Sequence, residues 1–233
     1  MKSTSRFITA AALAAALALG SSPAEAISIT GGVLSTTAGT YADSGAGAVN
    51  LTDTDGTNDN ATAFLLLELA GYAGLNNFGI YGFTQSGSTV TLGDTLLVFQ
   101  GSATSLTSAT IAFNVGAGTA TFNSITKNIG TTFGFYLEGP GGMFYSQASL
   151  NSDGVDHALL FNTAGSSASE LLGSTVVVGF EDLLGGGDLD YNDMIVGVND
   201  VTPTPVPEPG SMMLLGTGLF GLAGAARRRL NRQ

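Results

Sequence analysis

The chain has 233 residues, with 34 Gly, no Cys, no Trp and a formal net charge of −11. Charged residues make up only 11% of the sequence, a composition that favours β-structure with many turns over long helices. The absence of Cys excludes a disulfide scaffold, so an exported form must be stabilised by its core or by metal ions.

The few basic residues lie almost entirely at the two ends of the chain. Between residues 27 and 202, Lys127 is the one basic residue, against 16 of the 18 acidic residues, which gives that body a formal charge of −15. Such a body is a poor partner for nucleic acid and for anionic lipid surfaces. Cations and neutral sugars are better ones.

Residues 1–26 have the three parts of a secretory signal peptide in order. Two basic residues precede an apolar run over residues 7–20, and an A-x-A cleavage site follows at residues 24–26. The sequence therefore predicts cleavage by signal peptidase, with a mature chain that begins at Ile27.

The next segment is rich in Gly, Ser, Thr and Ala, and residues 27–34 are expected to form an edge strand. A D-x-D-G-x-N-D pattern follows, with the oxygen spacing and turn glycine of a calcium loop. Ordinary turn chemistry in Asn- and Asp-rich loops gives the same pattern. The weaker metal candidates in it are Asp53, Asp55, Asn58 and Asp59.

Short apolar runs bounded by Gly, Ser, Asn or Pro fill most of the body. Residues 63–74 fit a buried strand or a short helix, because a short apolar run does not decide between them. Strands are expected at residues 77–85, 95–99, 109–115, 119–122, 132–138, 143–147, 158–161, 175–180 and 194–198. This spacing predicts one all-β domain over residues 27–202, an antiparallel β-sandwich of jelly-roll-like type.

Residues 151–157 form another acidic turn, with Asp153 and Asp156 as weaker metal candidates. His157, the only histidine, is either a metal ligand, half of an acid/base pair with Asp156, or a hydrogen-bonded turn residue at a strand start. We favour the turn residue, because neighbouring residues on a strand point to opposite faces. One helical turn is expected at residues 167–172.

The segment G-F-E-D-L-L-G-G-G-D-L-D-Y-N-D, residues 179–193, is the densest acidic loop of the chain. No basic residue lies nearby, so a hard cation that takes oxygen ligands, above all Ca²⁺, is the natural partner. The candidate ligands are Glu181, Asp182, Asp188, Asp190, Asn192 and Asp193. The D-x-D-x-N spacing departs from an EF-hand after its first half. The alternative is a solvated acidic hairpin loop that caps its own backbone.

The C-terminal part changes character abruptly. A Pro-rich linker at residues 203–209 precedes an apolar, uncharged stretch at 210–226, long enough for one transmembrane helix, and a basic tail at 227–233. Basic residues stay on the cytoplasmic side, so the acidic body is expected beyond the inner membrane.

Pro207, Glu208 and Pro209, followed by the apolar stretch and by Arg227, Arg228 and Arg229, resemble the PEP-CTERM sorting signal of exported bacterial proteins. The resemblance implies an inner-membrane intermediate that is processed by an exosortase. It also implies a place at the cell surface or outside the cell, in association with exopolysaccharide or biofilm.

Residues 151–198 also resemble a bacterial surface domain of unknown function. Its pattern is N-S-D-G-x-D-H, then F-E-D-L, a Gly/Asp stretch and D-x-D-Y-N-D. The resemblance implies that the acids of the pattern are calcium ligands.

Three functions remain open at this point. The first is a non-enzymatic, calcium-binding surface or matrix protein. The second is a carbohydrate-binding module that uses Tyr136, Phe144 and Tyr145, although the absence of Trp weakens it. The third is a polysaccharide hydrolase that uses paired carboxylates. We expect no enzyme, because nucleophile machinery and a recognisable Ser elbow are absent from the sequence.

Overall fold

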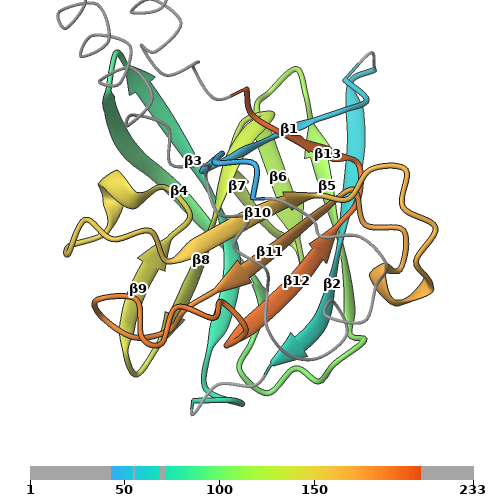
Figure 1. Cartoon of the computed structure of the whole chain (residues 1–233). Helices are drawn as coiled ribbons and strands as arrows, with labels where there is room; N and C mark the ends of the chain where they lie inside the picture. The colour runs from blue at the N-terminus through green and yellow to red at the C-terminus, as the bar shows by residue number, and fades with distance from the viewer. Residues whose placement is uncertain (1–42, 55, 69–71, 206–233) are drawn as a thin grey trace, which may run out of the picture.

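The computed structural model describes residues 43–54, 56–68 and 72–205, which form two antiparallel β-sheets packed face to face (Figure 1). Apart from the 3₁₀ turns η2 (Ala148–Leu150) and η3 (Ser169–Leu171), these residues contain no helix. The predicted all-β, two-sheet architecture is therefore confirmed. With six and seven strands the sheets are larger than those of an eight-stranded jelly roll.

The six-stranded sheet has the order β13-β1-β8-β3-β4, with β9 paired to β8. Its strands are β13 (Val201–Pro203), β1 (Val49–Leu51), β8 (Thr132–Gly139), β3 (Asn77–Ser86), β4 (Thr89–Phe99) and β9 (Gly142–Tyr145). The seven-stranded sheet has the order β10-β11-β12-β2-β5-β6-β7. Its strands are β10 (Ala158–Asn162), β11 (Val176–Phe180), β12 (Met194–Val198), β2 (Asn58–Glu68), β5 (Ser108–Asn114), β6 (Thr119–Phe122) and β7 (Ile125–Asn128).

The main core fills the space between the two sheets. Strand β5 shows the underlying pattern, because its exposed and buried residues alternate strictly. The buried set includes Phe113, whose ring stacks 5.3 Å from that of Phe133 on the opposite sheet. Each fully buried Phe stabilises the fold by about 1.5–3 kcal/mol relative to an exposed one.

A second apolar cluster lies on the outer face of β10, β11 and β12. It contains Leu66, Leu159, Phe161, Leu171, Val177, Tyr191 and Ile195. Because both faces of these strands are covered, β11 and β12 are buried along their whole length, which explains their uninterrupted apolar sequences. Tyr191 belongs to the loop between β11 and β12, so this cluster fixes the loop to the sheet.

Several strands differ from the sequence predictions. The ambiguous segment after residue 63 is the second half of β2, so it is a strand and not a helix. Strands β1, β7 and β13 were not predicted. Pro203, assigned to the linker, is the last residue of β13 and pairs with Val49. Proline is tolerated there because β13 is an edge strand.

The remaining segment predictions fall outside the described residues. These are the signal peptide at 1–26, the edge strand at 27–34, residues 206–209 with the Pro207-Glu208-Pro209 motif, the span at 210–226 and the basic tail at 227–233. Within the part of the chain that the structure describes, no helix has the length and apolar character needed to cross a membrane.

The sheet register places the acidic loops relative to one another. Phe180 pairs with Met194, so residues 181–193 form the loop that joins β11 to β12, and Met194 also pairs with Glu68 at the end of β2. Asn58 begins β2 ten residues earlier. At about 3.3 Å per residue, the two ends of this strand lie roughly 30 Å apart.

Candidate metal centre

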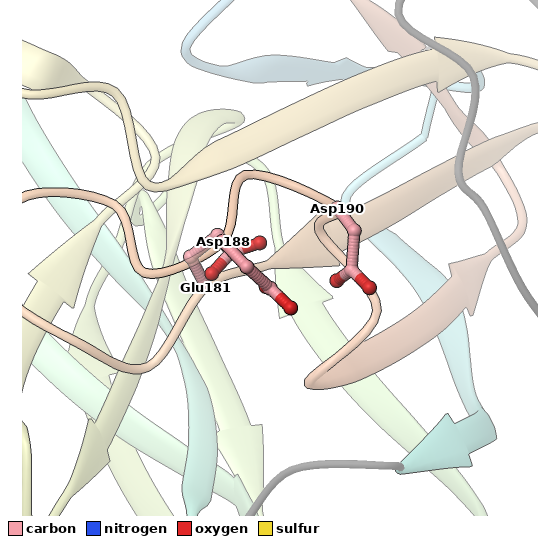
Figure 2. Close-up of side chains that lie close together, drawn as sticks. All are labelled: Glu181, Asp188 and Asp190. Carbon is pink, nitrogen blue, oxygen red and sulfur yellow. The ribbon is translucent and has the colours of Figure 1, made fainter.

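Three carboxylates of the β11–β12 loop converge. One oxygen each from Glu181, Asp188 and Asp190 lies within 4.8 Å of the other two. Figure 2 shows the three side chains reaching toward one space from different points of the loop. Glu181 is buried, Asp190 is half-buried and Asp188 is exposed, so the group opens to solvent on one side. Among the described residues it is the one group of three or more acidic or His side chains with this proximity.

Glu181 has an unusual environment for a carboxylate. Its side chain is 1% exposed, and its Oε1 accepts a 2.6 Å hydrogen bond from the backbone N–H of Tyr191. Its Oε2 is buried without a hydrogen-bond partner. Burial, followed by repulsion from Asp193 and Asp188, raises the pKa of Glu181 to about 7, although the Tyr191 bond opposes the shift. Near neutral pH this oxygen therefore needs either a proton or a cation.

The loop reaches this arrangement through left-handed backbone conformations. Gly185, Gly186 and Gly187 have φ values of 79°, 83° and 54°, and Leu189 and Tyr191 have 61° and 53°. Gly187 has a second reason to be glycine, because a Cβ at this position would collide with Oε2 of Glu181. The three glycines therefore supply backbone conformations that residues with a side chain resist.

Asp190 also stabilises the loop itself. Its two carboxylate oxygens accept hydrogen bonds from the backbone N–H and the side-chain amide of Asn192, at 3.2 Å and 2.5 Å. This is the Asx-turn chemistry expected of an acidic turn without a metal. The predicted ligand Asn192 thus directs its amide nitrogen, and not its oxygen, at Asp190.

Asp182 and Asp193 contact each other and do not belong to the three converging carboxylates, although Asp193 is close enough to repel Glu181. Oδ2 of Asp193 accepts the backbone N–H of Asp182 at 2.8 Å, and Oδ2 of Asp182 accepts the side-chain amide of Asn76 at 2.8 Å. Burial, with repulsion from Asp182 and Asp190, raises the pKa of Asp193 to about 6. Adjacent residues at a strand end point to opposite sides, which separates Asp182 from Glu181.

The acidic turn at residues 151–157 docks against the same loop. Oδ2 of Asp153 lies 2.9 Å from Nε2 of the fully buried His157 and also accepts the backbone N–H of Gly185 at 2.9 Å. These two contacts hold the pKa of Asp153 below its usual range, and the bond from Gly185 has the larger effect. Asn151 closes the turn by donating to the carbonyl oxygen of Val155 at 2.8 Å.

Asp156 takes no part in the contact between Asp153 and the imidazole of His157. Its Oδ1 accepts the backbone N–H of Ala158 at 3.2 Å, and its backbone carbonyl accepts the hydroxyl of Tyr191 at 3.1 Å. Burial raises the pKa of Asp156. His157 therefore pairs with Asp153 and not with Asp156. The sequence did not predict this partner, because two residues four positions apart meet here only through the shape of the turn.

The first acidic loop forms no comparable group within the described residues. Asp53 and Asn58 are exposed, Asp55 lies outside the described residues, and Asp59 extends into β2, where it pairs with Phe113. Oδ1 of Asp59 accepts the backbone N–H of Asn60 at 2.7 Å. The structure thus places the described candidates Asp53, Asn58 and Asp59 at the far end of β2 from Glu181.

The aromatic residues considered for sugar binding do not form an exposed platform. Tyr136 is 4% exposed and Phe144 is 3% exposed, and the Phe144 ring stacks against His157 at 4.0 Å. Tyr145 is half-buried, with its ring 5.2 Å from that of Tyr81. These rings belong to the packing of the β9 region.

Sequence reasoning missed the residues that support the carboxylates. Tyr191 donates a backbone N–H to Glu181, Asn76 donates its side-chain amide to Asp182 from a distant loop, and Asp153 accepts the backbone N–H of Gly185. Tyr191 carried the one available signal, because a large aromatic residue between acids indicates an anchor in the core. No sequence pattern pointed to Asn76.

Comparison with known families finds two matches, which cover consecutive stretches of the second half of the chain. Residues 118–200 match a family described as a domain of unknown function (DUF4114), a longer stretch than the 151–198 resemblance seen in the sequence. No curated protein and no solved structure matches the chain. Residues 205–229 match the PEP-CTERM protein-sorting motif. Directly after the stretch that matches DUF4114, the chain therefore carries a PEP-CTERM sorting signal, which supports export and processing by an exosortase.

Proposed function

We propose that this exported protein is a non-enzymatic cell-surface or extracellular matrix protein that binds one Ca²⁺ ion in the β11–β12 loop. The observation that carries the proposal is Glu181, a buried carboxylate whose Oε2 lacks a hydrogen-bond partner and which has an oxygen within 4.8 Å of an oxygen of each of two further carboxylates. An unpaired buried charge is costly, and a bound cation would offset that cost.

The chemistry of the group fits calcium better than other metals. All three side chains offer oxygen, and Ca²⁺ takes six to eight oxygen ligands in flexible geometry, with backbone carbonyls and water completing the set. The chain has no Cys, and its one His is committed to Asp153, so a zinc site is not favoured. Lys127, the one basic residue among those described, lies on β7 and not in this loop.

The location that the sorting signal supports is consistent with a weak calcium site. Extracellular calcium modules bind with dissociation constants of about 10⁻⁴–10⁻³ M, because the outside of a cell supplies calcium at such levels. We further propose that an inner-membrane intermediate precedes release or surface attachment, and that exopolysaccharide is the surrounding material. The acidic body has little positive charge and repels anionic polymers, so neutral exopolysaccharide is the better partner.

Isothermal titration calorimetry tests the calcium proposal. The exported protein is expected to bind one Ca²⁺, and Glu181→Gln, which keeps the shape but removes the buried charge, is expected to abolish measurable binding. Asp94→Asn is the matched control, because Asp94 is a hydrogen-bonded acid on β4, away from the loop. Equal affinity in Glu181→Gln and wild type would contradict the proposal and leave a solvated acidic turn.

Intact-mass measurement tests the processing part. Protein recovered outside the native cell is expected to begin at Ile27 and to lack Arg227, Arg228 and Arg229. Recovery of the full-length chain would contradict it.

A further inference from the structure

A chain of contacts through one buried histidine links the two parts of the candidate metal group. The backbone carbonyl of His157 accepts the N–H of Glu181 at 2.9 Å, and its Nε2 lies 2.9 Å from Oδ2 of Asp153. The same Oδ2 accepts the N–H of Gly185 at 2.9 Å. Glu181 is thus connected to the glycine segment that leads to the other two carboxylates.

We propose that Asp153 and His157 are positioning residues, which hold Gly185 so that Asp188 and Asp190 meet Glu181 before an ion binds. This inference rests on the proposed calcium site and deepens it. It gives the N-S-D-G-x-D-H segment a supporting role, distinct from the ligand role of the loop.

The environment of His157 shows what its imidazole contributes. The side chain is 0% exposed and its ring stacks on Phe144, with centroids 4.0 Å apart. Its Nδ1 is buried without a partner. Because Nε2 faces a carboxylate, a proton on Nε2 fits this contact. A phenyl ring would give the same packing without an orphaned nitrogen, so what the imidazole adds is the bond to Asp153.

The backbone of the loop needs such support. Leu189 and Tyr191 adopt left-handed conformations that residues with side chains resist, and these follow three consecutive left-handed glycines. Conformations of this kind persist only where surrounding contacts hold them. The bond from Gly185 to Asp153 holds one end, and that from the Tyr191 hydroxyl to the Asp156 carbonyl, at 3.1 Å, holds the other.

The first test is His157→Phe in the exported protein, with the calcium dissociation constant measured by calorimetry at a temperature where both proteins are folded. The substitution keeps an aromatic ring against Phe144 and removes the contact with Asp153. Affinity is expected to fall about tenfold or more, as it does when an outer contact of a metal ligand is lost. A role in stability alone would lower the melting temperature and leave this constant unchanged.

The second test compares Asp153→Asn with Asp153→Ala. Both remove the same charge, but only Asn keeps an oxygen that can accept the Gly185 N–H. The Asn variant is expected to bind calcium several-fold more tightly than the Ala variant. Hydrogen exchange of the Gly185 amide, measured by NMR in chelator, gives a readout without metal and is expected to be faster in Asp153→Ala and His157→Phe.

The outcomes separate this inference from the proposed function. Wild-type protein that binds no calcium overturns both. Calcium binding that is lost in Glu181→Gln but unchanged in His157→Phe and Asp153→Ala overturns the positioning role alone. Asp94→Asn, which removes a carboxylate that accepts two bonds from Asn128 at 3.0 and 3.1 Å, is expected to bind like wild type.

Discussion

The two loops at the ends of β2 are both rich in acidic residues and contain Gly, but they have different structures. In the loop at 181–193, a buried Glu, an Asp in an Asx-turn and an exposed Asp converge, supported by contacts from the turn at 151–157. In the loop at 53–59, the described acids are separate, and Asp59 is drawn into a strand. Acidic composition alone therefore does not create a site, because convergence depends on what packs against the loop.

The largest expected effect is the rise in melting temperature caused by calcium, which should depend on the loop at 181–193 and not on the loop at 53–59. A ligand at a hundredfold excess over its dissociation constant stabilises the folded state by about 2.7 kcal/mol, which corresponds to roughly 5–10 °C in a domain of this size. Asp190→Asn is expected to erase most of this calcium-induced rise in melting temperature, measured by circular dichroism against chelator. Asp53→Asn is expected to retain it.

Sodium chloride at matched ionic strength is the control, because screening acts on all the acids and coordination on a few. If Asp53→Asn lost the shift and Asp190→Asn kept it, the comparison between the loops would be reversed.

An intermediate effect is expected from pH in the absence of calcium. The pKa of Glu181 is raised from 4.5 to about 7 and that of Asp193 from 3.8 to about 6, so between these values the folded protein binds more protons than the unfolded chain. Stability must then fall as pH rises, and the metal-free protein is expected to melt several degrees lower at pH 8 than at pH 5.

The lowered pKa of Asp153 acts only at more acidic pH and leaves this window unaffected. Glu181→Gln is expected to flatten the dependence, measured by thermal melts, and saturating calcium is expected to reverse its sign. An unchanged slope in Glu181→Gln would show that the buried carboxylate is not its source.

The smallest expected effect is the difference in stability between Gly→Ala variants at different positions of the two loops. Ala at Gly185 or at Gly187 pays about 1–2 kcal/mol for a left-handed backbone, but only at Gly187 does the new Cβ also meet Glu181. Gly187→Ala is therefore expected to be destabilised by roughly 1 kcal/mol more than Gly185→Ala in urea unfolding. In the other loop, Gly56→Ala is expected to change stability by less than about 0.5 kcal/mol, because nothing lies closer than 3.6 Å. Equal losses at Gly185 and Gly187 would contradict the crowding at Glu181.

The sequence was sufficient for strands whose own residues alternate or are apolar throughout, such as β5, β11 and β12. It was insufficient for β7, whose residues are mostly exposed and polar, and for β1 and β13. Those two strands have three residues each and pair across more than 140 residues of sequence, so no local pattern marks them. The segment after residue 63 was ambiguous until its pairing with β12 and β5 made it a strand.

For the candidate site, the sequence by itself determined the chemistry: an oxygen-rich, Gly-containing loop between two apolar strands, without a basic residue nearby, ahead of a sorting signal for export. Only the tertiary structure decided which oxygens meet. Glu181 and Asp182 are neighbours in sequence, but side chains at a strand end alternate between faces, so the carboxylate of Glu181 meets those of Asp188 and Asp190 while the carboxylate of Asp182 binds the amide of Asn76. That division follows from the packing around β11 and its neighbouring turns, because burial and long-range hydrogen bonds, and not the spacing of acids, fix the direction of each carboxylate.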